Sequence, residues 1–137
     1  MADPDGTVAA LGERTLGALA EAMAIVLRPV TSTPADASRE ARELLAALHD
    51  MPRHWVAIDR GTTMSETDWA RALRAAQRRA TGAPIQYAAG KASFRHLTLD
   101  VDERVLIPRP ETEQLVELVL DATSEEGGGI AVDVGTG

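Results

Sequence analysis

The sequence predicts a mainly α-helical protein: a helical bundle comes first, then a β-hairpin, then a helix followed by one short strand. Three observations lead to this fold class. Up to about residue 82, apolar residues recur at three- and four-residue steps within alanine-rich segments, as in amphipathic helices. Apolar and polar residues then alternate over residues 97–101, as in a strand. Finally, an apolar run over residues 130–134 ends in a glycine-containing turn.

Composition narrows the class of protein. The 137 residues allow one domain, or one small domain with a part of another, and 45% hydrophobic residues supply a core. The net charge of −7 repels phosphate backbones, so direct DNA binding is not expected. The absence of cysteine excludes disulfides and thiolate zinc sites. An acidic N-terminus and the lack of about 18 consecutive apolar residues predict a cytoplasmic protein without a membrane partner.

The first two helices are separated by prolines. Periodicity predicts the first helix over residues 7–27, which Pro29 and Pro34 end. Asp36 or Ser38 can then cap a second helix, which runs through Asp50. The residues expected on its inward face are Ala41, Leu44, Leu45 and Leu48.

Two further helices complete the predicted bundle. Pro52 suits the first turn of a short helix over residues 53–59. Ser65 and Asp68 resemble a capping box and predict a fourth helix over residues 66–81. The side chains expected to face inward are Trp55, Val56 and Ile58 in the third helix, and Trp69, Leu73 and Ala76 in the fourth.

After Gly82 the pattern of apolar residues changes from helical spacing to alternation, and glycine and proline become frequent. We expect a strand pair within residues 88–101, and a fifth helix over residues 111–123. Residues 130–134 are expected to form a buried strand, which needs neighbours that the chain does not supply. The sequence therefore looks cut within a domain, and its last strand is expected to self-associate, pair with the hairpin or stay disordered. The inward side chains expected in the fifth helix are Leu115, Val116, Val119 and Leu120.

Two segments are candidates for chemistry. After the last strand, the run Asp133-Val134-Gly135-Thr136-Gly137 is typical of the start of a nucleotide or S-adenosylmethionine loop, although any tight turn accepts such glycines. Two prolines hold Arg109 in an extended segment before a helix, which suggests a positioning role. A rigid linker in which Arg109 pairs with Glu111 or Glu113 is the plainer alternative. An arginine stripe on the fourth helix is interpreted as a solvated face, and the scattered histidines predict no metal site.

Three segments together resemble a known family. They are Gly-Ala-Pro-Ile-Gln-Tyr-Ala-Ala-Gly at residues 82–90, Leu-Ile-Pro-Arg-Pro-Glu-Thr-Glu at residues 106–113, and Asp-Val-Gly-Thr-Gly at residues 133–137, with Phe94 following the first. Their order and spacing resemble the HemK/PrmC family, the protein-(glutamine) methyltransferases that act on peptide chain release factors. The preceding helical segment matches that family's N-terminal bundle in length and position.

The resemblance implies a fold and an activity. It implies a helical substrate-docking domain over residues 1–82, a hairpin linker over residues 83–107, and the start of a doubly wound α/β methyltransferase domain, truncated, over residues 108–137. The implied reaction moves a methyl group from S-adenosylmethionine to the glutamine amide of the Gly-Gly-Gln motif in class I release factors, which act in translation termination.

The resemblance also implies roles for particular residues. Asp133, Val134, Gly135, Thr136 and Gly137 match the cofactor loop, and Arg109, Glu111 and Thr112 match a segment beside the cofactor's methionine end. No catalytic residue is expected within this chain, because the family's Asn-Pro-Pro-Tyr motif would lie beyond Gly137. The chain alone is therefore expected to be inactive and to bind S-adenosylmethionine weakly or not at all.

The sequence leaves two alternatives open. The parent protein could be an amino-methyltransferase acting on adenine in DNA or RNA, because such enzymes share the cofactor loop. The negative net charge argues against that substrate. The chain could also be a stand-alone helical protein-interaction module with a vestigial glycine-containing tail.

Overall fold

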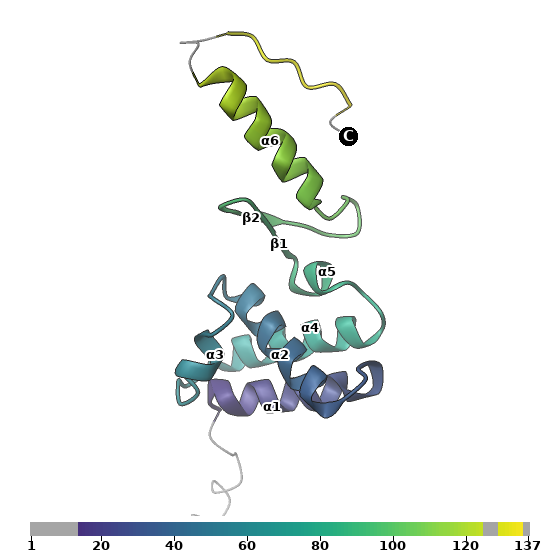
Figure 1. Ribbon diagram of the computed structural model, residues 1–137. Helices are drawn as coiled ribbons and strands as arrows, with labels where there is room; N and C mark the ends of the chain where they lie inside the picture. The colour runs from purple at the N-terminus through teal and green to yellow at the C-terminus, as the bar shows by residue number, and fades with distance from the viewer. Residues whose placement is uncertain (1–13, 125–128, 136–137) are drawn as a thin grey trace, which may run out of the picture.

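A computed structural model describes residues 14–124 and 129–135. Figure 1 shows a helical bundle at one end, a short helix and a hairpin beside it, and a last helix extending away from them. The helices are α1 (Leu16–Leu27), α2 (Pro34–Leu48), α3 (Trp55–Ile58), α4 (Glu66–Ala80), α5 (Ile85–Ala89) and α6 (Pro110–Thr123), with a 3₁₀ turn, η1 (Arg28–Val30). The strands are β1 (Lys91–Phe94) and β2 (Leu97–Asp100). A mainly helical fold with a hairpin is thus confirmed.

Hydroxyl caps begin three of the helices. The side chains of Thr15, Thr33 and Ser65 accept hydrogen bonds from the backbone N–H three residues later, at distances of 3.2, 3.1 and 3.0 Å. Residues 7–13 of the expected first helix lie outside the described residues, but the Thr15 cap starts α1 at Leu16. The cap expected at Asp36 or Ser38 is wrong, because the Thr33 hydroxyl and Pro34 already begin α2.

The core lies where α1 packs against α2 and α4. Its fully buried large side chains are Leu16, Leu19, Met23, Leu27, Leu44, Leu45 and Val56. The predicted inward face of α2 is confirmed, and Trp69 and Leu73 of α4 are partly buried against the core. Ile58, by contrast, is 70% exposed. Positions two apart on a helix point about 200° apart, so Val56 and Ile58 cannot both face the core.

A close backbone approach ties α1 to the loop before α4. The N–H groups of Leu16 and Gly17 donate to the carbonyls of Thr62 and Arg60, each at 2.8 Å. A Cβ on Gly17 would lie 3.2 Å from the Arg60 carbonyl oxygen, closer than most side chains allow. Glycine therefore permits this contact.

The strand pair predicted within residues 88–101 is confirmed, but a short helix that was not predicted precedes it. Residues 85–89 form α5, which Gly90 ends in the left-handed region at φ 71°. The strands β1 and β2 pair antiparallel, with Lys91 opposite Asp100 and Phe94 opposite Leu97. Ala88 belongs to the bundle core, and Ala92 and Val101 are also buried. Both α5 and the hairpin therefore pack onto the helical bundle.

The final described segment contributes nothing to a core. None of the residues of α6 is buried, so the inward positions expected at Leu115, Val116, Val119 and Leu120 are wrong in this structure. Residues 130–134 form no strand, and Val134 is 89% exposed. A strand needs backbone partners, and the described residues place none beside this run. A truncated methyltransferase fold is not confirmed.

No helix among residues 14–124 is both long and apolar enough to cross a lipid bilayer.

Candidate functional site

The predicted cofactor loop is open to solvent where the structure describes it. Asp133, Val134 and Gly135 are exposed and belong to no helix or strand. Gly135 has φ 82°, and a Cβ added there would meet no atom within 4 Å. Thr136 and Gly137 lie outside the described residues. Residues 133–135 therefore form no cradle that would fit a cofactor.

The predicted positioning segment has the expected backbone. Arg109 is extended, at φ −101° and ψ 148°, and occupies the N-cap of α6. Its carbonyl accepts hydrogen bonds from the N–H groups of Thr112 and Glu113, at 3.0 and 3.4 Å. Glu111 lies in the first turn, where an acidic side chain suits the positive helix end.

Neither an ion pair nor a side-chain hydrogen bond joins Arg109 to Glu111 or Glu113, which are all described. The structure also records no such contact between residues 109–112 and residues 133–135. The pairing expected for a rigid linker is thus not seen. The cofactor roles of Arg109, Glu111, Thr112 and residues 133–137 stay predictions.

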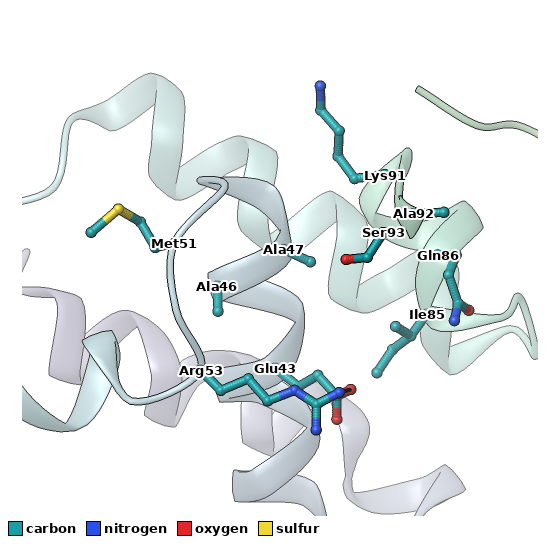
Figure 2. A pocket seen from close by; sticks show the side chains of 10 residues that line it. All are labelled: Glu43, Ala46, Ala47, Met51, Arg53, Ile85, Gln86, Lys91, Ala92 and Ser93. Carbon is teal, nitrogen blue, oxygen red and sulfur yellow. Dashed lines mark ion pairs between the residues drawn. The ribbon is translucent and has the colours of Figure 1, made fainter. Parts of the chain in front are cut away.

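The bundle and hairpin enclose a groove that sequence reasoning missed. Figure 2 shows the side chains that line it, which come from α2, the segment after it, α5 and β1. The volume of this cavity is about 260 Å³. The groove exists because small side chains line it. Ala46 and Ala47 lie on the α2 side, and Ser93 lies on the β1 side. We call it the α2–β1 groove; the remaining residues that line it are Glu43, Met51, Arg53, Ile85, Gln86, Lys91 and Ala92.

Charged pairs border the α2–β1 groove. The Arg53 guanidinium lies 3.0 Å from the Glu43 carboxylate, and the Lys91 ammonium lies 2.6 Å from the carboxylate of Asp100. A neighbouring hollow of about 100 Å³ shares six of the lining residues. There the Thr98 hydroxyl donates to the Asp50 carboxylate at 2.7 Å and links hairpin to bundle. The groove is therefore bordered by paired charges, while half of its lining residues are apolar.

One sequence signal could have pointed to this groove. Ile85 and Gln86, which line it, belong to the Gly82–Gly90 segment that carries part of the family resemblance. The other lining residues come from two segments, residues 43–53 and 91–93, which are far apart in the chain, and no local motif marks them. Only folding brings these segments together.

The arginine stripe of α4 is mostly engaged in tertiary contacts. Arg79 pairs with Glu40 of α2 where both side chains are largely buried. Arg71 donates to the Leu48 carbonyl at 2.7 Å, and Arg78 lies 2.9 Å from the Glu103 carboxylate. The solvated face predicted for this stripe is therefore wrong for Arg79, whereas Arg71 and Arg78 are exposed as predicted. All three residues fasten α4 to neighbouring segments.

Some groups outside the groove have shifted pKa values. Burial, and secondly the positive charge of Arg71, lower the pKa of His49, whose Nε2 has no hydrogen-bond partner among the described residues. Hydrogen bonds from Arg104 lower the pKa of Asp102 to about 2. The hydroxyl of Thr33, followed by Arg39, lowers the pKa of Asp36. None of these three residues lines the α2–β1 groove.

Within residues 14–124 and 129–135, no three histidine, aspartate or glutamate side chains form a group that could hold a metal ion.

The fold defines a small helical domain with an attached hairpin, followed by one further helix. Residues 31–90, which span α2 to α5, match the family model described as PrmC N-terminal domain. The predicted resemblance to the HemK/PrmC family is thus confirmed.

Proteins named release factor glutamine methyltransferase are similar to this chain. The protein of Lactococcus lactis subsp. lactis (strain IL1403) is 59% identical over 54 residues, which are 39% of this chain and 20% of that protein. The protein of Neisseria gonorrhoeae (strain ATCC 700825 / FA 1090) is 42% identical over 98 residues, 72% of this chain and 35% of that protein. The protein of Burkholderia pseudomallei (strain K96243) is 39% identical over 106 residues, 77% and 37% respectively. The chain thus spans from a fifth to somewhat over a third of the length of these relatives.

Proposed function

We propose that this chain is the substrate-docking part of a methyltransferase that uses S-adenosylmethionine to methylate the glutamine amide of the Gly-Gly-Gln motif in class I release factors. The observation that carries the proposal is the PrmC N-terminal domain match over residues 31–90. Identities of 39–42% over about 100 residues to proteins named for this reaction support it. The domain boundaries at residues 82 and 107, and a cytoplasmic location, belong to the same proposal.

The chain alone is proposed to be inactive. An amide nitrogen is a poor nucleophile, so its methylation depends on orientation and on hydrogen bonds that localise its lone pair. The 137 residues contain no asparagine and hence no Asn-Pro-Pro-Tyr motif. The open backbone of residues 133–135 supports weak or no binding of S-adenosylmethionine. No step of methyl transfer is therefore assigned to a residue of this chain.

A chimaera tests the activity. In it, this chain replaces the matching segment of the Neisseria gonorrhoeae relative. The chimaera is expected to methylate a class I release factor, while the 137-residue chain transfers no methyl group and gives no heat in a titration with S-adenosylmethionine. A release factor with Gly-Gly-Ala in place of Gly-Gly-Gln is the control. A folded chimaera that binds S-adenosylmethionine yet leaves the release factor unmethylated would contradict the proposal, and methylation of DNA or RNA would favour the adenine alternative.

A binding measurement tests the docking role separately. The α2–β1 groove is the first surface to probe, since most of its lining residues lie within the matched segment. Ala47→Arg would fill the groove and is expected to weaken binding of a class I release factor roughly tenfold or more by calorimetry. Ala57→Arg, at an exposed position on α3, is the matched control and should leave binding unchanged. Equal affinities for both variants would place the docking surface elsewhere.

Self-association through residues 130–134 also stays a prediction. The exposed apolar side chains of Ile130, Val132 and Val134 support it. Sedimentation of the chain at several concentrations tests it, and a monomer throughout would contradict it.

A further inference from the structure

One ion pair joins α6 to the hairpin. The Arg95 guanidinium contacts Oε1 of Glu117 through Nε at 2.7 Å and through Nη2 at 2.6 Å. Within the described part of the chain, no other side-chain hydrogen bond or ion pair connects α6 to an earlier helix or strand. Because α6 also buries no side chain, its direction depends on few contacts.

The surroundings of this pair are open and polar. Hairpin turn and α6 border a hollow of about 450 Å³, lined by Arg95, His96, Pro110, Glu113, Gln114 and Glu117. Pro110 is the one apolar residue among them. Close apolar packing therefore does not fix α6 against the hairpin, and the ion pair spans the space instead.

The arginine of this pair is held on a rigid support. Arg95 lies in the hairpin turn with φ 54°, and its side chain is 21% exposed. The hairpin is fastened to the bundle by the Thr98 to Asp50 hydrogen bond and by the burial of Ala92. The position of the guanidinium thus follows that of the helical domain.

The segment between β2 and α6, residues 101–109, is fastened only in its first half. Arg78 pairs with Glu103 at 2.9 Å, and the Tyr87 hydroxyl donates to the Val105 carbonyl at 2.6 Å. Beyond that point, residues 106–109 are exposed or half-buried and precede α6 without a side-chain hydrogen bond to the bundle. Rotation about this short segment would swing α6 as a whole.

We propose that Arg95 and Glu117 are positioning residues, which set the direction in which α6 leaves the helical domain. The hairpin acts as the spacer that presents Arg95 to Glu117. Any consequence for methyl transfer rests on the proposed function, because Arg109, Glu111 and Thr112 begin the helix that this pair orients. The orientation itself does not depend on that function.

Paired spin labels test the orientation directly. The chain has no cysteine, so Gln77→Cys on α4 and Asp121→Cys on α6 add two unique labels at exposed positions. Pulsed electron resonance should give one main distance for the otherwise unchanged chain. Arg95→Ala or Glu117→Ala should reduce the population at that distance about two- to fivefold, as expected for an exposed ion pair. High salt should act in the same direction.

Two controls make the test decisive. Lys91→Ala breaks an ion pair of the same hairpin that does not reach α6, so the main distance should keep its population. The double variant R95E/E117R reverses the pair and should restore the main distance. Circular dichroism confirms that each variant is folded. An unchanged distribution in Arg95→Ala, or no recovery in the reversed pair, would overturn the proposal, whereas failure of the chimaera to methylate would leave these distances unaffected.

Discussion

The helical domain and α6 both carry apolar side chains at helical spacing, but these side chains are mostly buried in the domain and mostly exposed on α6. Both contain leucines and valines at helical spacing. In the domain the leucines of α1 and α2 are buried, whereas α6 buries no side chain, and Leu118 is 66% exposed. Figure 1 shows α6 extending away from the bundle. Periodicity in the sequence therefore specifies a helix with an apolar face, but that face is buried only where another element packs against it.

Hydrogen exchange should show the largest difference between the two regions. An isolated helix of 14 residues is marginal in water, so the amides of α6 are expected to exchange at least about 100-fold faster than those of α1 and α2. Mass spectrometry of peptides from each helix measures this ratio. Equal protection would mean that the apolar face of α6 is covered in solution, and loss of that protection on dilution would identify a second copy as the cover.

A pair of leucine truncations is expected to give the next largest effect. Leu44→Ala removes a fully buried side chain and should lower the free energy of unfolding by about 3 kcal/mol. Leu118→Ala, in α6, is the matched control and should change it by less than about 0.5 kcal/mol. Urea unfolding followed by circular dichroism compares the two. Similar losses would contradict the division into a packed and an unpacked region.

The features that sequence predicted well are those determined locally. The Ser65 cap, the span of α4 and the inward face of α2 depend on residues within a few turns of one another. The one-turn helix α5 was missed because five residues between Pro84 and Gly90 are too short for periodicity to show. The strand prediction for residues 130–134 was wrong for a different reason, because a strand forms only beside partner strands of a sheet.

In the candidate site too, local features were predicted from the sequence and features that depend on tertiary packing were not. The extended backbone of Arg109 was predicted because the flanking prolines act on their immediate neighbours. The α2–β1 groove was not predicted, because Ala47 and Ser93 meet only through tertiary packing. Similarly, the sequence alone predicted a solvated Arg79, because its partner Glu40 lies on α2, far away in the chain.

The contribution of a helix cap to stability can be measured by removing the Ser65 hydroxyl. Ser65→Ala removes the hydroxyl that accepts from the Asp68 N–H, and should cost about 1 kcal/mol of unfolding free energy. Ser38→Ala is the matched control, since the Ser38 hydroxyl donates only to the Pro34 carbonyl within α2. Its effect should be a few tenths of a kcal/mol or less. Equal effects in urea unfolding would remove the special role of the Ser65 cap.

The smallest expected effect is the pH dependence of the free energy of unfolding. We expect it to come from His49, which lies in the packed helical domain. His49 lies at the end of α2, with its ring centroid 5.3 Å from that of Trp55. Burial lowers its pKa below 6.5, so the unfolded chain binds a proton at a higher pH than the folded chain does. The free energy of unfolding should therefore fall as the pH decreases through and below 6.5, down to the lowered pKa of the folded state. His49→Phe keeps a ring against Trp55 and should flatten this slope in urea unfolding. His96→Gln, at the exposed hairpin turn, should leave the slope in place. A slope that survives His49→Phe would assign the titration to another group and remove this distinction between the two regions.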